Sequence, residues 1–461
     1  FEGYLAAITG KWQYDNLSPR IIETRNINFS AERYFLDKTR NVFLFRYTRN
    51  RRDFYSPLDA GIRSRFGVIS NIETRSEDAF AFGDSLDYDF GRRVLLKLQG
   101  NVFSREIVRE TRYKYYADNL NPGANTSTQE LKIEGSSEVV FTIGSSLSSS
   151  VRFYYQERDE KHQVQLDDSL STGIFEKYST LEEQRNNHSR RTALSSNLTL
   201  SLSSATSLSL TGSASILKYD TPSKDNNDDR DELWHNLNLT MFSRFNQYLD
   251  LRISADVNLV HLVYLQSTRS ADNTWNRIFR LSPRLRYTPG KAITSVNTFE
   301  VLANYTAYDF EYPSSPIRSF VFRQFGLNDS TIIELTRRFG VEVFALGRFY
   351  ERGEFRWESF AERPLTYFEE KTFIGSLKYR LTERLLFSIG IRYFNQLRFI
   401  YIGSERQVDQ QLRSIGPITT ILWDSGGRTE FALRGWYEDQ RQTGTPHRAI
   451  TNMTMALVLH I

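Results

Sequence analysis

Residues 249–259 read LDLRISADVNL, and every odd position of this stretch is apolar while every even position is polar or charged. Successive side chains of a β-strand point to opposite faces of its sheet. The stretch therefore predicts a strand with one apolar face and one polar face. An amphipathic helix does not fit, because its apolar positions recur every three or four residues.

The same period of two recurs along the whole chain. A second clear example is the stretch LLFSIGIRY at residues 385–393, and further ones lie at 94–102, 208–216, 299–307 and 431–437. No comparable run has the period of a helix, and no long linker, low-complexity tract or change in composition divides the chain. The sequence therefore predicts one domain of the all-β class, residues 1–461.

The expected connections between strands alternate between short and long. Nine short turns are predicted at 37–40, 90–93, 143–146, 203–206, 244–246, 288–291, 338–340, 381–383 and 424–427. The longer polar connections between them include 56–76, 117–129, 159–190, 220–232 and 441–448. Nine short and ten outer connections require twenty strands, with 18–22 as the range. This layout predicts a single closed transmembrane antiparallel β-barrel, with short periplasmic turns, long extracellular loops and both termini on the short-turn side.

A large soluble β-protein is the alternative, because the strands of sandwiches and propellers also alternate. A propeller would repeat particular residues in every blade, and no residue motif recurs with the spacing of the short turns. The chain has no run of 18 or more apolar residues, so no transmembrane helix is expected. Its net charge of +4 is too small to indicate a nucleic-acid partner.

The last residues of the chain carry a family resemblance. Alternate positions of the final segment are mostly apolar: Thr451, Met453, Met455, Leu457, Leu459 and Ile461. A strand of this kind at the C-terminus resembles the signal by which the barrel-assembly machinery recognises bacterial outer-membrane β-barrels, the porin-like class. The resemblance implies an outer-membrane location, outer-membrane lipid as a partner, and a contact with that machinery during biogenesis.

The polar face of the predicted strands is the candidate lining of a lumen. Ten cations and four acids are assigned to it: Arg46, Lys97, Arg105, Arg252, Asp256, Arg284, Arg286, Glu300, Glu342, Arg348, Arg392, Arg398, Arg434 and Glu438. The functional interpretation is a field that favours anions, or a dock for an acidic partner. The structural interpretation is a wide lumen filled by arginine ion pairs. The residues expected to face lipid are Leu251, Ile253, Val257, Ile389, Ile391 and Leu433.

Other candidate sites are weaker. Asp225, Asn227 and Asp229 have the first spacings of a calcium loop, but Arg230 replaces the turn glycine, so a solvated acidic loop is favoured over a divalent ion bridging to lipid phosphate. His261 is expected at the membrane interface. No catalytic motif, haem-attachment motif or cysteine occurs, so we expect no enzyme activity, no cofactor and no metal centre.

Two functions remain open at this stage. A barrel of about 20 strands is wider than porins of about 16–18 strands, which already leave an aqueous channel. The first function is therefore a channel that passes solutes across the outer membrane. The second is a sleeve or scaffold in a multi-protein envelope complex for secretion, an appendage or electron conduction. No plug segment is expected before the first strand, so inward loops or a periplasmic or lumen-filling protein would limit leakage.

Overall fold

The computed structural model describes residues 4–17, 20–35, 38–55, 71–91, 93–111, 124–165, 171–311, 317–403, 405–426 and 429–459. These residues form twenty strands: β1 (Tyr4–Leu17), β2 (Arg20–Phe35), β3 (Thr39–Tyr55), β4 (Asn71–Asp89), β5 (Val94–Thr111), β6 (Thr126–Ile143), β7 (Leu147–Val164), β8 (Asn187–Ser201), β9 (Thr206–Asp220), β10 (Arg230–Asn246), β11 (Leu249–Tyr264), β12 (Thr274–Tyr287), β13 (Ile293–Tyr308), β14 (Phe320–Glu334), β15 (Phe339–Arg356), β16 (Ala361–Thr382), β17 (Leu385–Ile402), β18 (Glu405–Asp424), β19 (Thr429–Gln442) and β20 (Arg448–Leu459). The prediction of twenty antiparallel strands is confirmed.

Among the described residues, helix occurs in two connections. Helix α2 (Thr172–Glu183) lies between β7 and β8, and a 3-10 turn, η1 (Ser270–Asp272), lies between β11 and β12. The sequence indicated neither. Among the described residues, neither helix is long and apolar enough to cross a membrane.

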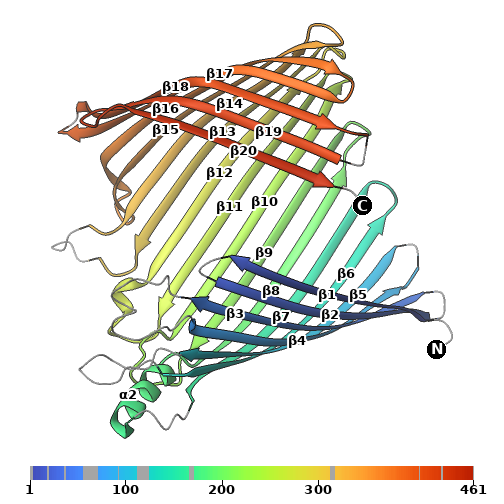
Figure 1. The fold of residues 1–461 in the computed structure, drawn as a ribbon, viewed down its shortest axis with the longest axis vertical. Helices are drawn as coiled ribbons and strands as arrows, with labels where there is room; N and C mark the ends of the chain where they lie inside the picture. The colour runs from blue at the N-terminus through green and yellow to red at the C-terminus, as the bar shows by residue number, and fades with distance from the viewer. Residues whose placement is uncertain are drawn as a thin grey trace. The chain divides into compact units, whose positions relative to one another are not determined.

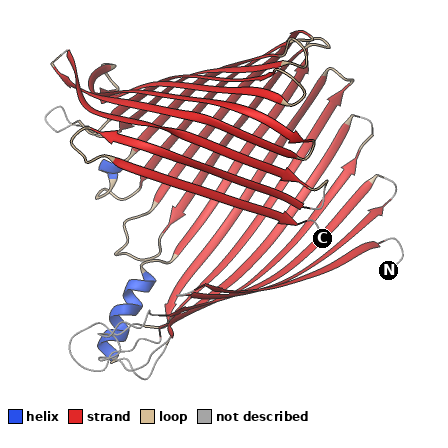
Figure 2. Ribbon diagram, turned by 45° about the horizontal axis from the view of Figure 1, so that its top comes forward, coloured by secondary structure: helices blue, strands red, loops and turns tan. Residues whose placement is uncertain are grey.

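The chain divides into two compact units. The first contains residues 1–198, 213–234 and 262–273, and the second contains 199–212, 235–261 and 274–461. In the first unit β1 to β7 pair in chain order, each antiparallel to the next. In the second, β12 to β20 do the same. Within each unit the consecutive strands lie side by side (Figures 1 and 2).

The connections agree with the predicted pattern in part. Two to five residues separate the strands at each of the nine predicted positions, although β10 continues to Asn246, β16 continues to Thr382, and the connection before β15 falls at 335–338. Residues 37, 92 and 427 of the predicted turns lie outside the described residues. The other ten connections are not all long, which corrects the sequence prediction. Only two residues separate the end of β1 from the start of β2, and only two separate β17 from β18. Because a hairpin needs only two connecting residues, an outer connection can be as short as an inner one.

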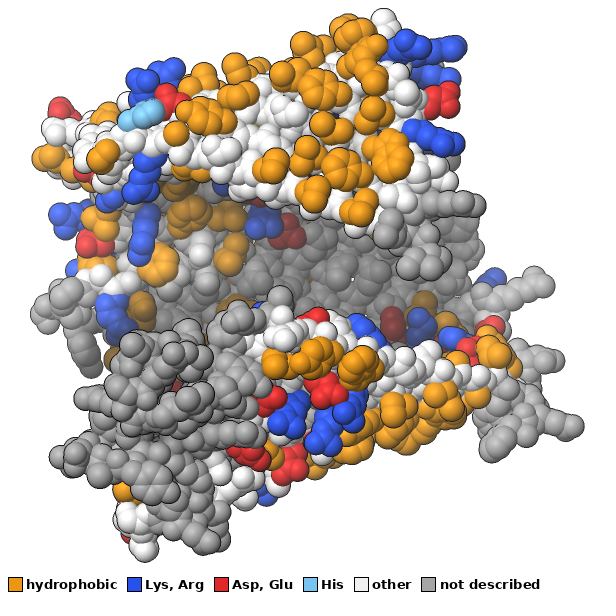
Figure 3. Space-filling model, in the orientation of Figure 1, with side chains coloured by type: hydrophobic (Ala, Val, Ile, Leu, Met, Phe, Trp, Pro, Cys, Tyr) orange, Lys and Arg blue, Asp and Glu red, His pale blue; other side chains and the backbone are white. Residues whose placement is uncertain are grey.

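Apolar side chains lie on the surface of these strands rather than in a core. Among the described residues, the buried hydrophobic ones are Ala79, Ala124, Ala307, Val321 and Phe355. By contrast, Ile391 on β17 is 50% exposed and Met455 on β20 is 71% exposed. Figure 3 shows hydrophobic side chains gathered over the strands labelled β17 to β20 in Figure 1. A soluble protein buries most such residues, so this surface is unlike that of the soluble alternative.

A small polar network interrupts the apolar face of β13 and β14. Ser295 donates a hydrogen bond of 3.3 Å to the Asp329 carboxylate, and Thr331 donates one of 3.1 Å to the same carboxylate. The Asn297 amide donates to the Ser295 hydroxyl at 3.0 Å. The next residues along this face are apolar, with Phe299 opposite Leu327. Asp329 is therefore an acid on a mainly apolar face, and the residues that give it hydrogen bonds belong to its own hairpin.

The close approach of β18 to β19 at Gly416 gives a first prediction. A Cβ atom at Gly416 would lie 1.7 Å from the carbonyl oxygen of Tyr437, whereas one at Gly435 would lie 3.8 Å from its nearest neighbour, the carbonyl oxygen of Asn452. Gly416→Ala should therefore force the two strands apart and lower the free energy of unfolding by about 1–3 kcal/mol or more. Gly435→Ala is the matched control and should change it by less than about 1 kcal/mol. Urea unfolding of protein folded into lipid vesicles measures both, and equal effects would contradict the register described here.

Candidate functional site: the polar face of the strands

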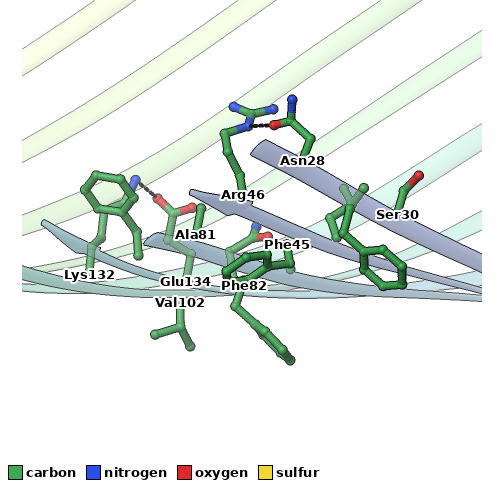
Figure 4. Close-up of a pocket in the computed structure, with 14 residues that line it drawn as sticks. Asn28, Ser30, Phe45, Arg46, Ala81, Phe82, Val102, Lys132 and Glu134 are labelled. Carbon is green, nitrogen blue, oxygen red and sulfur yellow. Dashed lines mark hydrogen bonds and ion pairs between the residues drawn. The ribbon is translucent and has the colours of Figure 1, made fainter. Parts of the chain in front are cut away.

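The register of the first unit places three predicted lumen residues on one face. Arg46 of β3 lies opposite Asn28 of β2 and Ala81 of β4. Lys97 and Arg105 of β5 lie opposite Asp87 and Ala79, which alternate onto the same side of β4 as Ala81. Figure 4 shows Arg46 and Asn28 on one side of the strands, and Phe82 and Val102 on the other. The Arg46 Nε donates to the Asn28 side chain at 2.9 Å.

The second unit sorts its side chains in the same way. Opposite residues of neighbouring strands share a face of the sheet, and following them from strand to strand places Arg284 of β12 and Arg434 of β19 on the same face. By this register and by alternation along each strand, that face holds Arg284, Arg286, Glu300, Glu342, Arg348, Arg392, Arg398, Arg434 and Glu438. Ile389, Ile391 and Leu433 fall on the opposite face. That the polar face lines a lumen and the apolar face meets lipid stays a prediction.

Strand β11 follows the same rule. Asp256 accepts a hydrogen bond of 2.5 Å from Asn238 of β10, and Ser254 and Thr240 share one of 3.0 Å. Alternation places Arg252 on this polar side and the predicted lipid-facing residues Leu251, Ile253 and Val257 on the other.

Acids meet many of the cations on the polar face. In the first unit the Glu130 carboxylate of β6, only 7% exposed, forms ion pairs with Arg105 of β5 and with Arg158 Nε of β7, the latter at 2.7 Å. Arg158 also pairs with Glu160, which contacts His162 at 2.8 Å. The polar residues thus form a continuous network across β5, β6 and β7.

In the second unit the ion pairs also cross strands. Arg392 of β17 pairs with Glu438 of β19, and Gly416, the residue opposite Arg392 on the intervening β18, has no side chain to block the contact. Ser414 donates a further hydrogen bond of 2.8 Å to Glu438. Similar pairs join Arg280 to Glu300 at 3.6 Å, Arg348 to Glu370 at 3.7 Å, and Arg398 to Asp409 at 3.2 Å. Glu342 is paired with Lys378 at 2.7 Å.

Six of the predicted lumen cations form no ion pair within 4.0 Å to an acid among the residues that the structure describes. They are Arg46, which instead contacts the Asn28 side chain, and Lys97, Arg252, Arg284, Arg286 and Arg434. The structural interpretation of the arginines, an ion-pair network, therefore describes part of the polar face. Any electric field that favours anions would therefore arise mainly from these cations without ion pairs.

The acidic loop 225–232 is held by protein groups. Asp228 pairs with Arg269 at 2.7 Å. Asp229 accepts hydrogen bonds from both the backbone N–H and the hydroxyl of Thr221, each at 2.6 Å. Asn226 donates to the carbonyl of Gln184, just after α2, at 2.6 Å. Within the described ranges no three acidic or histidine side chains gather as metal ligands. The acidic loop thus makes polar contacts that connect it to the residue after α2, to Thr221 and to Arg269.

His261 lies at the end of β11 far from its short turn, on the apolar side. Its ring stacks on Trp275 with centroids 4.2 Å apart, and its Nε2 lies 2.8 Å from the Asp309 carboxylate. The Arg277 guanidinium sits 3.8 Å from the ring centroid of Trp357 beside this stack. Aromatic rings with polar partners are typical of a membrane interface, which is where the sequence placed His261.

Comparison with known proteins identifies the fold. No family model matches the sequence, and no curated protein matches it. The ferric citrate transporter FecA, in its unliganded form, has a TM-score of 0.52 and 10% identity over 99% of this chain and 73% of that chain. The ferric-catecholate import receptor Fiu from K12 E. coli has a TM-score of 0.52 and 9% identity over 99% of this chain and 77% of that chain.

Likeness at so low an identity concerns the fold alone. The chain has the antiparallel strand fold of bacterial outer-membrane β-barrel proteins, and the predictions of that class and of an outer-membrane location are supported by it.

The charge network of the first unit gives a second prediction. Glu130→Gln leaves Arg105 and Arg158 without the carboxylate between them, and we expect the free energy of unfolding to fall by about 1.5–3 kcal/mol. The control is Glu106→Gln on β5, because among the described residues its side chain accepts a single long hydrogen bond of 3.5 Å, from Gln129, and its loss should matter little. Urea titrations of vesicle-folded protein provide the comparison. A Glu130 variant as stable as the control would show that the network does not support the fold.

Proposed function

We propose that the chain closes into a single barrel that spans the bacterial outer membrane and passes solutes across it. The observation that carries this proposal is the division of each strand into an exposed apolar face and a polar face rich in charge. In a bilayer the apolar face meets the lipid, and the polar face encloses water. The fold shared with FecA and Fiu supports a transport barrel, and diffusion through a polar lumen is the simplest mechanism for it.

Closure follows from the needs of the edge strands. β1 pairs with β2 along one edge, and β20 pairs with β19 along one edge. In hydrocarbon each unpaired backbone N–H or C=O costs several kcal/mol, so an open edge is not viable there. Because the number of strands is even, β1 and β20 would run antiparallel to each other in a closed barrel and could pair as their neighbours do. Such pairing would place Ile8 and Met455 on the outer, apolar side.

The sidedness of the barrel follows from its connections. We place the nine short turns and both termini in the periplasm, and the connections that contain α2 and the acidic loop outside the cell. Protease added to intact cells should then cut near Gly173 and spare the turn at Pro289.

Closure gives a third prediction, which exploits the absence of cysteine from the sequence. Ala7→Cys on β1 is combined in turn with single cysteines at positions 450 to 456 of β20, and vesicle-folded protein is oxidised. We expect a disulfide in one or two adjacent combinations, because only nearly opposite residues bring their sulfurs within reach. The pair Gly435→Cys with Met453→Cys is the positive control, since these residues lie opposite each other. Disulfide formation in the control alone would mean that β1 and β20 do not meet.

Transport gives a fourth prediction. Vesicles that contain the folded chain should release small solutes faster than empty vesicles and should conduct in planar bilayers, with a preference for anions that fades at high salt as the charges are screened. If the barrel is instead the sleeve of an envelope complex, the native complex should conduct less than the purified barrel. Vesicles as tight as empty ones would contradict a diffusion channel.

A further inference from the structure

Two arginines face each other directly across β11 and β12. The carbonyl of Tyr248 accepts a hydrogen bond of 2.8 Å from the N–H of Thr288, which fixes the register at the short-turn end. Arg252 and Arg284 each lie four residues along the strands from this pair. At the other end, the stacking of His261 on Trp275 gives the same register. Arg252 and Arg284 are therefore opposite residues of an antiparallel pair, on the polar face.

This arrangement is unfavourable by itself. Directly opposite residues have Cβ atoms about 4.5–5.5 Å apart, and like charges in such positions repel. The acids close by are already engaged: Asp250 with Arg244 at 3.1 Å, and Asp256 with the Asn238 amide at 2.5 Å. Both arginines are exposed, so their guanidinium groups are open to solvent.

By the same register Asp250, which is paired with Arg244, lies opposite Arg286, and Asp256 lies opposite Arg280, so the acids of this neighbourhood already have other partners. Arg286 follows Arg284 on the same face, is also exposed, and is likewise without an ion pair among the described residues. Thr298 of β13 lies opposite Arg284, and Asn328 of β14 lies opposite Thr298. By contrast Arg280, four residues away on the same strand and face, is matched by Glu300 at 3.6 Å. Arg280 in the middle of β12 thus has an acid partner, whereas Arg284 and Arg286, nearer the short turn, form no ion pair within the described part of the chain.

We propose that Arg252 and Arg284, assisted by Arg286, form a binding site for the carboxylate or phosphate group of a small anionic solute. A guanidinium presents a planar fork of N–H donors that matches such an oxyanion, and two opposing forks hold it from both sides. The bound anion replaces the repulsion between the two arginines by two charge-assisted contacts. The site rests on the proposed function in one respect: a solute must reach it through the water-filled lumen of the proposed barrel, from the short-turn side or from the loop side.

Binding is measured on the full chain in detergent, with inorganic phosphate and citrate as the probes and chloride used to hold the ionic strength constant. Titration calorimetry gives the Kd, and thermal unfolding gives the shift in Tm. We expect wild-type protein to bind one or both probes and to gain Tm. Binding of citrate alone would identify a carboxylate site, and binding of phosphate alone a phosphate site.

The variants separate this site from general charge. Arg252→Gln and Arg284→Gln should each weaken binding about tenfold or more, because each removes a charge-assisted contact. Without anion, both should be at least as stable as wild type, since each ends the repulsion. The matched control Arg280→Gln removes the same charge from the same face and should change the Kd by no more than about twofold.

Two results would overturn the proposal: wild-type protein that binds neither probe, or Arg280→Gln that weakens binding as much as Arg284→Gln. These measurements need folded protein and no conduction. A chain that binds anions but does not conduct would therefore refute the channel and leave the site, whereas a chain that conducts without binding would do the reverse.

Discussion

The register between neighbouring strands is the constraint on which the rest of this structure depends. The side-chain period of a strand is two, so a slip of one residue exchanges its two faces completely. In β17 such a slip would bring Arg392 to the face that now carries Ile389 and Ile391. It would also move Arg392 away from Glu438, which it reaches across β18. Hydrophobic sorting and ion pairing therefore specify the same register independently.

Charge on the polar face is managed locally. A wall of arginines without acids would repel itself and destabilise the fold. The structure answers this with pairs that cross one or two strands, of which the Glu130 network is the most extended. Arg252 and Arg284 form no such pair among the described residues, so the repulsion between them destabilises the fold. Binding of an anion would remove this repulsion. Positions of unrelieved repulsion are thus informative about function in a way that well-paired charges are not.

The sequence was sufficient for the features that depend on period alone. Alternation in stretches such as 249–259 predicted the strands and their two faces, and the turn residues predicted all nine short connections. Helix α2 could not be predicted, because it has no strong amphipathic pattern and no buried residue, and contacts from outside it fix its place, such as His162 Nδ1 at 3.5 Å from Glu182.

The partners of the charged residues were also beyond the sequence. Alternation assigns Arg105 to a face, but not to Glu130, because the offset between β5 and β6 depends on a long connection whose residues give no register. For the same reason the opposition of Arg252 and Arg284 appears only once the pairing of β11 with β12 is known. The face on which a residue lies can be predicted from one strand alone, whereas its contact partner depends on how two strands are aligned.

The Asp329 network bears on how such a chain enters a membrane. The hydrogen bonds described for it come from β13 and β14, which are consecutive strands. These bonds can therefore form once the two strands have paired. A lone β14 would carry a bare carboxylate into hydrocarbon, whereas the finished hairpin carries one whose oxygens already have donors. If the apolar face meets lipid as proposed, pairing of these two strands before they enter the membrane would avoid burying a carboxylate without donors. The hydrogen bonds of Asp329 would in this way favour the insertion of a completed hairpin over that of an isolated strand.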